Sequence, residues 1–134
     1  MKGIELAQDQ ESGARAVNYG LETAKLIAEK LGYKKTKNPR SNEYAKEGKT
    51  VAIKCAHARV GIIGVTYKML DRISSVLACF ERDNGDYDIY EISPGIYRRI
   101  MTPTRSTGSS TGKVGIALRT DIIKNGKYIQ RVNL

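Results

Sequence analysis

The fold of this protein is decided by the stretch Asn42-Glu43-Tyr44-Ala45-Lys46-Glu47-Gly48-Lys49-Thr50-Val51-Ala52-Ile53-Lys54. In its second half, the apolar side chains of Val51 and Ile53 alternate with Ala52 and Lys54, which is the period of a strand with one apolar face. Gly48 supplies the residue that a tight turn requires. We therefore predict a β-hairpin with arms at 42–46 and 49–56 and a turn at Glu47-Gly48.

An amphipathic helix is predicted ahead of this hairpin, over Ser12–Leu31. Its apolar residues recur at spacings of three and four, which places them in one stripe: Val17, Leu21, Ala24, Ala28 and Leu31. Gly32 follows the last of them and suits a left-handed C-cap. We therefore expect the helix to end at Leu31, ahead of a basic loop over 34–41.

A second main helix is predicted after a short strand at Val60–Val65. Thr66 is a suitable N-cap, and the helix is expected to run to about Arg82. Its stripe consists of six apolar residues: Met69, Leu70, Ile73, Val76, Leu77 and Phe80. Tyr87–Ile92 is then predicted as a strand, and Pro94–Met101 as one or two helical turns that begin at a proline.

The C-terminal third is predicted to consist of a flexible basic loop at 102–113 and a basic β segment at 114–134. Ser, Thr and Gly dominate the loop, and Val114–Leu118 begins the segment as a strand. The Asn125-Gly126 pair between apolar runs predicts a small C-terminal β-hairpin. The expected whole is one α/β domain over 1–134, with a central mixed sheet flanked by two main helices.

The charge of the chain points to a nucleic acid as its partner. The net charge is +9, and the residues from Arg98 onward carry eight Lys and Arg against one acid, Asp121. Clustered positive charge attracts phosphates by releasing their counterions. The alternatives are that the charge aids solubility or meets an acidic protein.

The hairpin carries residues that resemble the core of the PD-(D/E)xK superfamily, the restriction-endonuclease-like nucleases. The resemblance covers Ala14–Ile92 and consists of a helix, an acid on one strand, a glycine turn and a strand that ends in apolar-x-Lys. In that family, an acid and an acid-x-Lys hold a divalent metal beside the scissile phosphate. The resemblance implies that Glu43 is a metal ligand and that Lys54 is catalytic. It also implies a Mg²⁺-dependent endodeoxyribonuclease, which cuts duplex DNA as a homodimer.

One position departs from the family pattern, because the second acid is replaced by Ala52. Oxygen ligands hold Mg²⁺, so the loss of one carboxylate weakens or abolishes the site. Three explanations remain open: natural or engineered inactivation of a nuclease, replacement of the acid by Glu22 or Glu47, and a fortuitous resemblance. The same residue favours the alternative function of a non-catalytic nucleic-acid-binding or adaptor domain.

Several basic residues outside the hairpin are predicted to contact the nucleic acid. His57, the only histidine, is either a phosphate donor or a structural hydrogen-bonding group. The predicted contacts are Lys34, Lys35, Lys37, Arg40, His57, Arg59, Arg98, Arg99, Arg105 and Lys113.

The composition also bounds the location of the protein. No apolar run approaches the length of a membrane span, so no membrane association is expected. Cys55 and Cys79 lie in apolar surroundings and are expected to be reduced thiols. These observations together predict a cytoplasmic protein.

Overall fold

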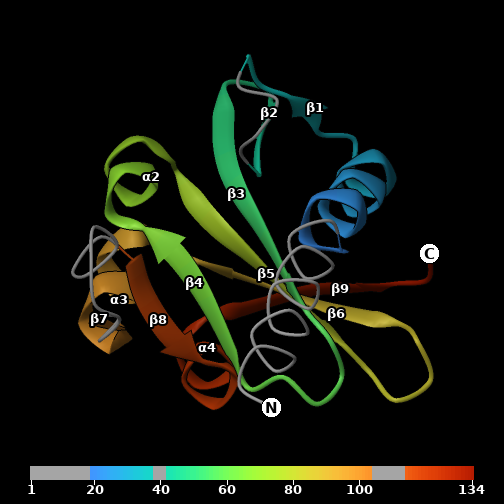
Figure 1. Ribbon diagram of the computed structural model, residues 1–134. Helices are drawn as coiled ribbons and strands as arrows, with labels where there is room; N and C mark the ends of the chain where they lie inside the picture. Colours follow the sequence, from blue (N-terminus) through green and yellow to red (C-terminus); the bar gives the residue numbers. More distant parts are fainter. Residues whose placement is uncertain (1–18, 38–41, 104–113) are drawn as a thin grey trace, which may run out of the picture.

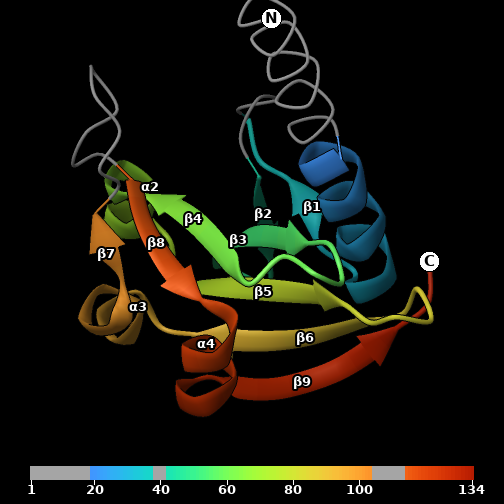
Figure 2. The ribbon, with the colours of Figure 1, turned by 60° about the horizontal axis from the view of Figure 1, so that its bottom comes forward.

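The protein is built in three layers, as the computed structural model shows for residues 19–37, 42–103 and 114–134. A six-stranded mixed sheet forms the middle layer (Figure 1). The N-terminal helix, described over residues 19–31, packs on one face of this sheet, and a three-stranded sheet with short helices packs on the other (Figure 2). The predicted α/β class with a mixed central sheet is therefore confirmed.

The central sheet has the strand order β1-β2-β3-β5-β6-β9. Strands β3 and β5 are parallel, and all other neighbours are antiparallel. The strands are β1 (Lys34–Lys35), β2 (Glu43–Lys46), β3 (Lys49–Ala56), β5 (Ser75–Glu81), β6 (Tyr87–Ile92) and β9 (Lys127–Val132).

The second layer of strands is antiparallel and has the order β4-β8-β7. It consists of β4 (Ile62–Thr66), β8 (Val114–Leu118) and β7 (Thr102–Pro103). Three short helices accompany it, namely α2 (Tyr67–Arg72), α3 (Pro94–Ile100) and α4 (Arg119–Asn125). None of the described helices is long and apolar enough to cross a membrane.

The predicted hairpin of β2 and β3 is confirmed. Glu47 and Gly48 both have positive φ, at 51° and 80°, as a two-residue type I′ turn requires. The helix end at Gly32 is also confirmed, since its φ is 81° and the amide of Tyr33 donates to the carbonyl of Ala28 at 2.8 Å. The part of the predicted helix before residue 19 lies outside the described residues.

The predicted second main helix is wrong beyond Arg72. The helix α2 ends there because Ile73 is extended, at φ −95° and ψ 155°, and β5 follows. From Val76 to Phe80 no residue is more than 3% exposed, because β5 lies between two packed layers. A strand that is buried on both faces is apolar at every position and does not alternate between apolar and polar residues. A continuous apolar run also contains the spacings of three and four residues that are typical of a helix, so it was predicted as one. One main helix therefore flanks the sheet, and the three-stranded sheet covers the other face.

The predicted C-terminal hairpin is also wrong. Asn125 ends helix α4, and the amide of Gly126 donates to the carbonyl of Ile122 at 2.7 Å. The strands on either side join different sheets, since β8 pairs with β4 and β7, whereas β9 pairs with β6. The C-terminal segment is thus part of both sheets. Thr102 and Pro103, assigned to the flexible loop, form β7, and the rest of that loop lies outside the described residues.

Gly126 is required for close packing rather than for a turn. A Cβ at this position would lie 2.8 Å from the carbonyl oxygen of Ile122 and 3.1 Å from that of Glu91. Both are main-chain atoms, so Gly126→Ala is expected to cost about 1–3 kcal/mol of unfolding free energy. Urea denaturation measures this loss. Gly95→Ala is the matched control, because its Cβ would meet nothing within 4 Å, and it should leave stability unchanged or raised. Equal effects of both changes would contradict the packing argument.

Candidate functional site

The register of the β2–β3 hairpin brings three of the predicted site residues onto one face of the sheet. Glu43 pairs directly with Ala52, and Lys54 lies two residues further along β3. Paired residues share a face, as do residues two apart on a strand. The amide of Ile53 donates to the carbonyl of Asn42 at 2.9 Å, which makes Glu43–Ala52 the next, non-hydrogen-bonded pair. Side chains approach most closely in such a pair. We call this the site face.

The backbone of Glu43 is held on both sides. On one side, Glu43 pairs with β3. On the other side, its carbonyl accepts hydrogen bonds from the amide and the hydroxyl of Thr36, each at 3.2 Å. Lys34 of β1 pairs with Ala45, two residues from Glu43, and therefore also belongs to the site face. The edge strand β1 and its neighbour β2 thus place a lysine and a carboxylate on the same face of the sheet.

Arg72 is the partner of Glu43 and was missed by the sequence analysis. Its Nε donates to Oε1 and Oε2 of Glu43 at 2.9 and 3.1 Å, and its Nη2 also contacts Oε1. The Glu43 side chain is 8% exposed, whereas that of Arg72 is 49% exposed. The two residues are 29 positions apart in the sequence. Arg72 is the last residue of α2, and the residues around it form no motif that indicates an ion pair. No sequence signal could have paired them.

The electrostatics of the site favour the ionised form of Glu43. The hydrogen bonds from Arg72 lower the pKa of this carboxyl most strongly, against the effect of burial, and the charges of Arg72, Lys35 and Lys54 lower it further. Burial lowers the pKa of the Lys54 ammonium, while the charge of Glu43 acts in the opposite direction. Glu43 and Lys54 are therefore electrostatically coupled.

Ala52 is part of the hydrophobic core. Its exposed fraction is 0%, and it packs in the cluster that contains Val76 and Ile73. No group of three His, Cys, Asp or Glu side chains suited to a metal occurs within 19–37, 42–103 and 114–134. One carboxylate, already bonded to an arginine, does not make a tight Mg²⁺ site. The described donor set therefore does not fit the metal that the family resemblance implies.

The other predicted acids do not join the site face. Glu47 lies at the hairpin turn, four residues from Glu43, or about 13 Å along an extended strand. Glu22 belongs to the N-terminal helix, which packs on the opposite face against Val51 and Ile53. It lines a pocket with Lys35 and other residues there. Neither acid stands where the side chain of a carboxylate at position 52 would lie.

His57 lies on the face opposite to Lys54. Its ring stacks on that of Tyr19, with centroids 3.5 Å apart, and its Nδ1 lies 3.4 Å from Oε1 of Glu81. These contacts are compatible with a structural role, and the predicted phosphate contact of His57 stays a prediction, since its side chain is 56% exposed. Cys55 and Cys79, which pair across β3 and β5, are free thiols, as predicted.

Several exposed cations lie on β1, α2 and α3. Lys68 lies one helical turn before Arg72 on α2, so both project from the same side of the helix. Arg98 of α3 contacts Asp71 of α2, which brings α3 beside the same helix. Lys34, Lys35, Lys37, Arg59 and Arg99 are exposed as well. Arg40, Arg105 and Lys113 lie outside the described residues.

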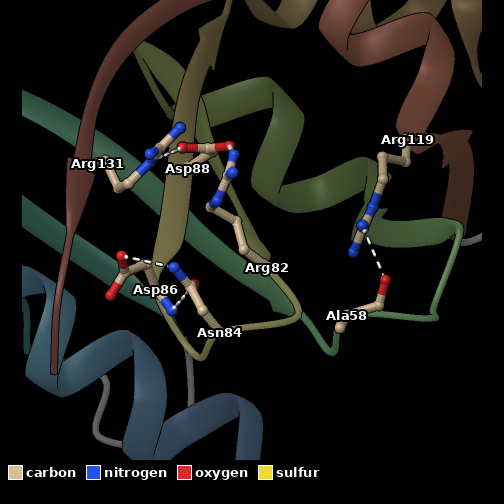
Figure 3. Close-up of polar contacts among 7 residues, drawn as sticks. All are labelled: Ala58, Arg82, Asn84, Asp86, Asp88, Arg119 and Arg131. Atoms are coloured by element: carbon tan, nitrogen blue, oxygen red, sulfur yellow. Dashed lines mark hydrogen bonds and ion pairs between the residues drawn. The ribbon is translucent and has the colours of Figure 1, made fainter.

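The C-terminal cations are less available than the charge count implied. Farther along the site face is a cavity of about 450 Å³ that Arg82 and Asp88 help to line. Asp88 binds two arginines, Arg82 and Arg131 (Figure 3). Nη1 of Arg82 lies 3.1 Å from Oδ2 of Asp88, and Nε of Arg131 lies 2.8 Å from Oδ1. Burial alone would raise the pKa of Asp88, but these two arginines outweigh it and lower the pKa.

Arg119 is likewise engaged within the protein. It donates to the carbonyl of Ala58 at 3.0 Å (Figure 3). It also donates to the carbonyl of His57 at 2.8 Å, and its guanidinium lies 4.7 Å from the ring centroid of Phe80. Arg119 and Arg131 therefore bind protein groups. Among the C-terminal cations, the prediction of DNA contacts stays with the residues named for it from the sequence, Arg98, Arg99, Arg105 and Lys113.

No protein-family model matches this chain, and a search of curated proteins gives no match.

Arg72 and Glu43 also make a testable contribution to stability. Because the folded pKa of Glu43 lies below its ordinary value of 4.5, its stabilisation is complete above that pH and is lost as the pH falls through the folded pKa. Arg72→Gln is expected to lower the unfolding free energy by about 1–2 kcal/mol near neutral pH, discounted for the exposure of Arg72. The difference should shrink in acid. Urea denaturation at several pH values measures it.

Arg98→Gln is the control for this experiment. It breaks an exposed ion pair with Asp71 and should cost less than about 1 kcal/mol. A deficit of Arg72→Gln that persists unchanged in strong acid would contradict the role of ionised Glu43.

Proposed function

We propose that this protein binds duplex DNA through the site face. We propose further that it is of restriction-endonuclease-like type, with Mg²⁺-dependent phosphodiester hydrolysis inactivated at Ala52. The observation that carries the proposal is the direct pairing of Glu43 with position 52, with Lys54 on the same face. This is the juxtaposition that the family pattern of an acid and an acid-x-Lys implies, with one carboxylate removed.

The surroundings of the site support a phosphate-bearing partner. Lys34 shares the site face, and Lys68 and Arg72 lie on one side of α2. Lysine and arginine side chains bind the DNA backbone mainly through its phosphates, without reading sequence. An acidic protein would meet the same charges, and it is distinguished from DNA by the salt dependence of duplex binding.

A second candidate function is a non-catalytic nucleic-acid-binding domain. The complete burial of Ala52 in the apolar cluster favours it, because the core is packed around a methyl group at the position of the missing acid. In this case the same cations bind DNA, and no substitution at position 52 creates hydrolysis.

Duplex binding as a function of salt concentration tests the proposal. The double variant Lys34→Gln, Lys68→Gln is expected to bind more weakly, and its log–log salt slope should be shallower by about 1.8, since each phosphate contact contributes about 0.9. The matched control is Lys124→Gln, Lys127→Gln. These residues are also exposed, but Lys127 lies on β9, at the sheet edge opposite β1.

The control pair should leave the slope nearly unchanged. Equal losses from the two double variants would show that DNA binding is not centred on the site face. An absence of salt-dependent duplex binding by the unmodified chain would overturn the proposed function.

A further inference from the structure

The Glu43–Arg72 pair is asymmetric in its exposure. Glu43 is buried, with 8% of its side chain exposed, whereas half of the Arg72 side chain faces solvent. Arg72 uses Nε and Nη2 for the carboxylate. A guanidinium carries five N–H donors, so this pairing leaves donor capacity on an exposed, positioned cation.

The balance of charge at the site differs from that of a metal centre. The cations Lys54 and Arg72 act on a single carboxylate, Glu43, and Lys34 lies on the same face opposite Ala45. Two facing carboxylates would need a divalent cation before a phosphate could approach. Three cations with one carboxylate favour a phosphate directly. The positive charge beside Glu43 is therefore supplied by Arg72, whereas in a metal-dependent site a divalent cation would supply it.

We propose that Arg72 is a phosphate ligand of this protein and that the site face binds a DNA phosphodiester without a divalent metal. The inference rests on the proposed DNA-binding function. In it, Glu43 orients the guanidinium through Nε and Nη2, and the remaining N–H groups donate to phosphate oxygens. Arginine suits this task because its planar fork binds a carboxylate and a phosphate at the same time.

A purely structural role for Arg72 makes a different prediction. If Arg72 only stabilised Glu43, loss of the ion pair would act in the same direction in both variants, and Arg72→Gln would weaken DNA binding no more than the loss of a remote lysine such as Lys127. If Arg72 binds phosphate, Arg72→Gln removes an attraction, while Glu43→Gln removes a repulsion. The two variants should then shift the affinity in opposite directions.

Fluorescence anisotropy with a labelled DNA duplex, at constant ionic strength, separates these cases. The chain is measured in EDTA and in Mg²⁺, beside Arg72→Gln, Glu43→Gln and the control Lys127→Gln, an exposed lysine on β9 at the sheet edge opposite β1. We expect the same affinity in EDTA and Mg²⁺. Arg72→Gln should bind about tenfold more weakly, as for a lost charge-assisted hydrogen bond. Glu43→Gln should bind as tightly or more tightly, and Lys127→Gln should be nearly unchanged.

The outcomes are distinguishable. DNA binding that requires Mg²⁺, or parallel losses in Arg72→Gln and Glu43→Gln, would overturn this inference and leave the proposed function standing. An absence of duplex binding by the unmodified chain would overturn both. Circular dichroism of each variant establishes that the compared proteins are folded.

Discussion

Ala52→Glu is expected to convert this chain into a Mg²⁺-dependent nuclease. The new carboxylate would stand directly opposite Glu43 in a non-hydrogen-bonded pair, two residues from Lys54. Two carboxylates with phosphate oxygens can hold a hydrated Mg²⁺, which one carboxylate does poorly. A metal ion at a scissile phosphate contributes several kcal/mol, so plasmid cleavage should rise by about 10²–10⁴-fold.

Relaxation of supercoiled plasmid with Mg²⁺ or Mn²⁺ measures this gain, and calorimetry measures metal binding separately. Ala52→Gln is the matched control, since it adds nearly the same bulk to the core position without a charge. Ala52→Asp tests whether a shorter carboxylate fits the buried site better. Metal-independent gains, or equal gains from glutamine and glutamate, would contradict the assignment of position 52.

Strong metal-dependent cleavage by the unmodified chain would show that another acid supplies the ligand. Glu22 would be the first to examine, because it lies beside Lys35 near the β1–β2 edge. Failure of every variant to cleave, with no heat of metal binding, would favour the non-catalytic binding function.

The second large effect is expected at Lys54. In the Ala52→Glu background, Lys54→Met should lower the cleavage rate by about 10²-fold or more, because a cation beside the reacting phosphate is lost. Methionine keeps an unbranched side chain of similar length, so the partly buried position remains filled. Duplex affinity should fall much less than the rate, since Lys34, Lys68 and Arg72 remain.

Single-turnover cleavage and anisotropy measure the two quantities on the same protein. Lys46→Gln is the control, as its ammonium on β2 donates to the carbonyl of Leu31 at 2.8 Å. It should leave the rate unchanged. A proportional loss of rate and affinity in Lys54→Met would make Lys54 a binding residue without a role in hydrolysis.

Sequence alone determined the hairpin and the geometry of its face. Glu47-Gly48 adopts the positive φ values of a two-residue turn, and such a turn fixes the register of both arms. With the register fixed, Glu43 must oppose Ala52, and the strand period places Lys54 beside them. These are local consequences of turn chemistry and alternation, so no distant contact was needed to predict them.

Tertiary structure decided the elements whose local signals fitted two conformations. The run at 75–81 fits a helical stripe, but it becomes β5 because β3 and β6 pair with it on either side and both faces are buried. Asn125-Gly126 suits a hairpin, but Gly126 instead lets α4 approach the backbone of β6. In each case the energy of packing and strand pairing outweighs the local preference.

Only the folded chain could identify Arg72. Arg72 and Glu43 are 29 positions apart in the sequence. Arg72 ends α2, which connects β4 to β5, whereas Glu43 begins β2 of the hairpin. Nothing in the spacing of the sequence encodes such a contact, because it depends on where α2 ends above the sheet. The sequence therefore determined which side chains share the site face, and the tertiary structure determined which cation meets its carboxylate.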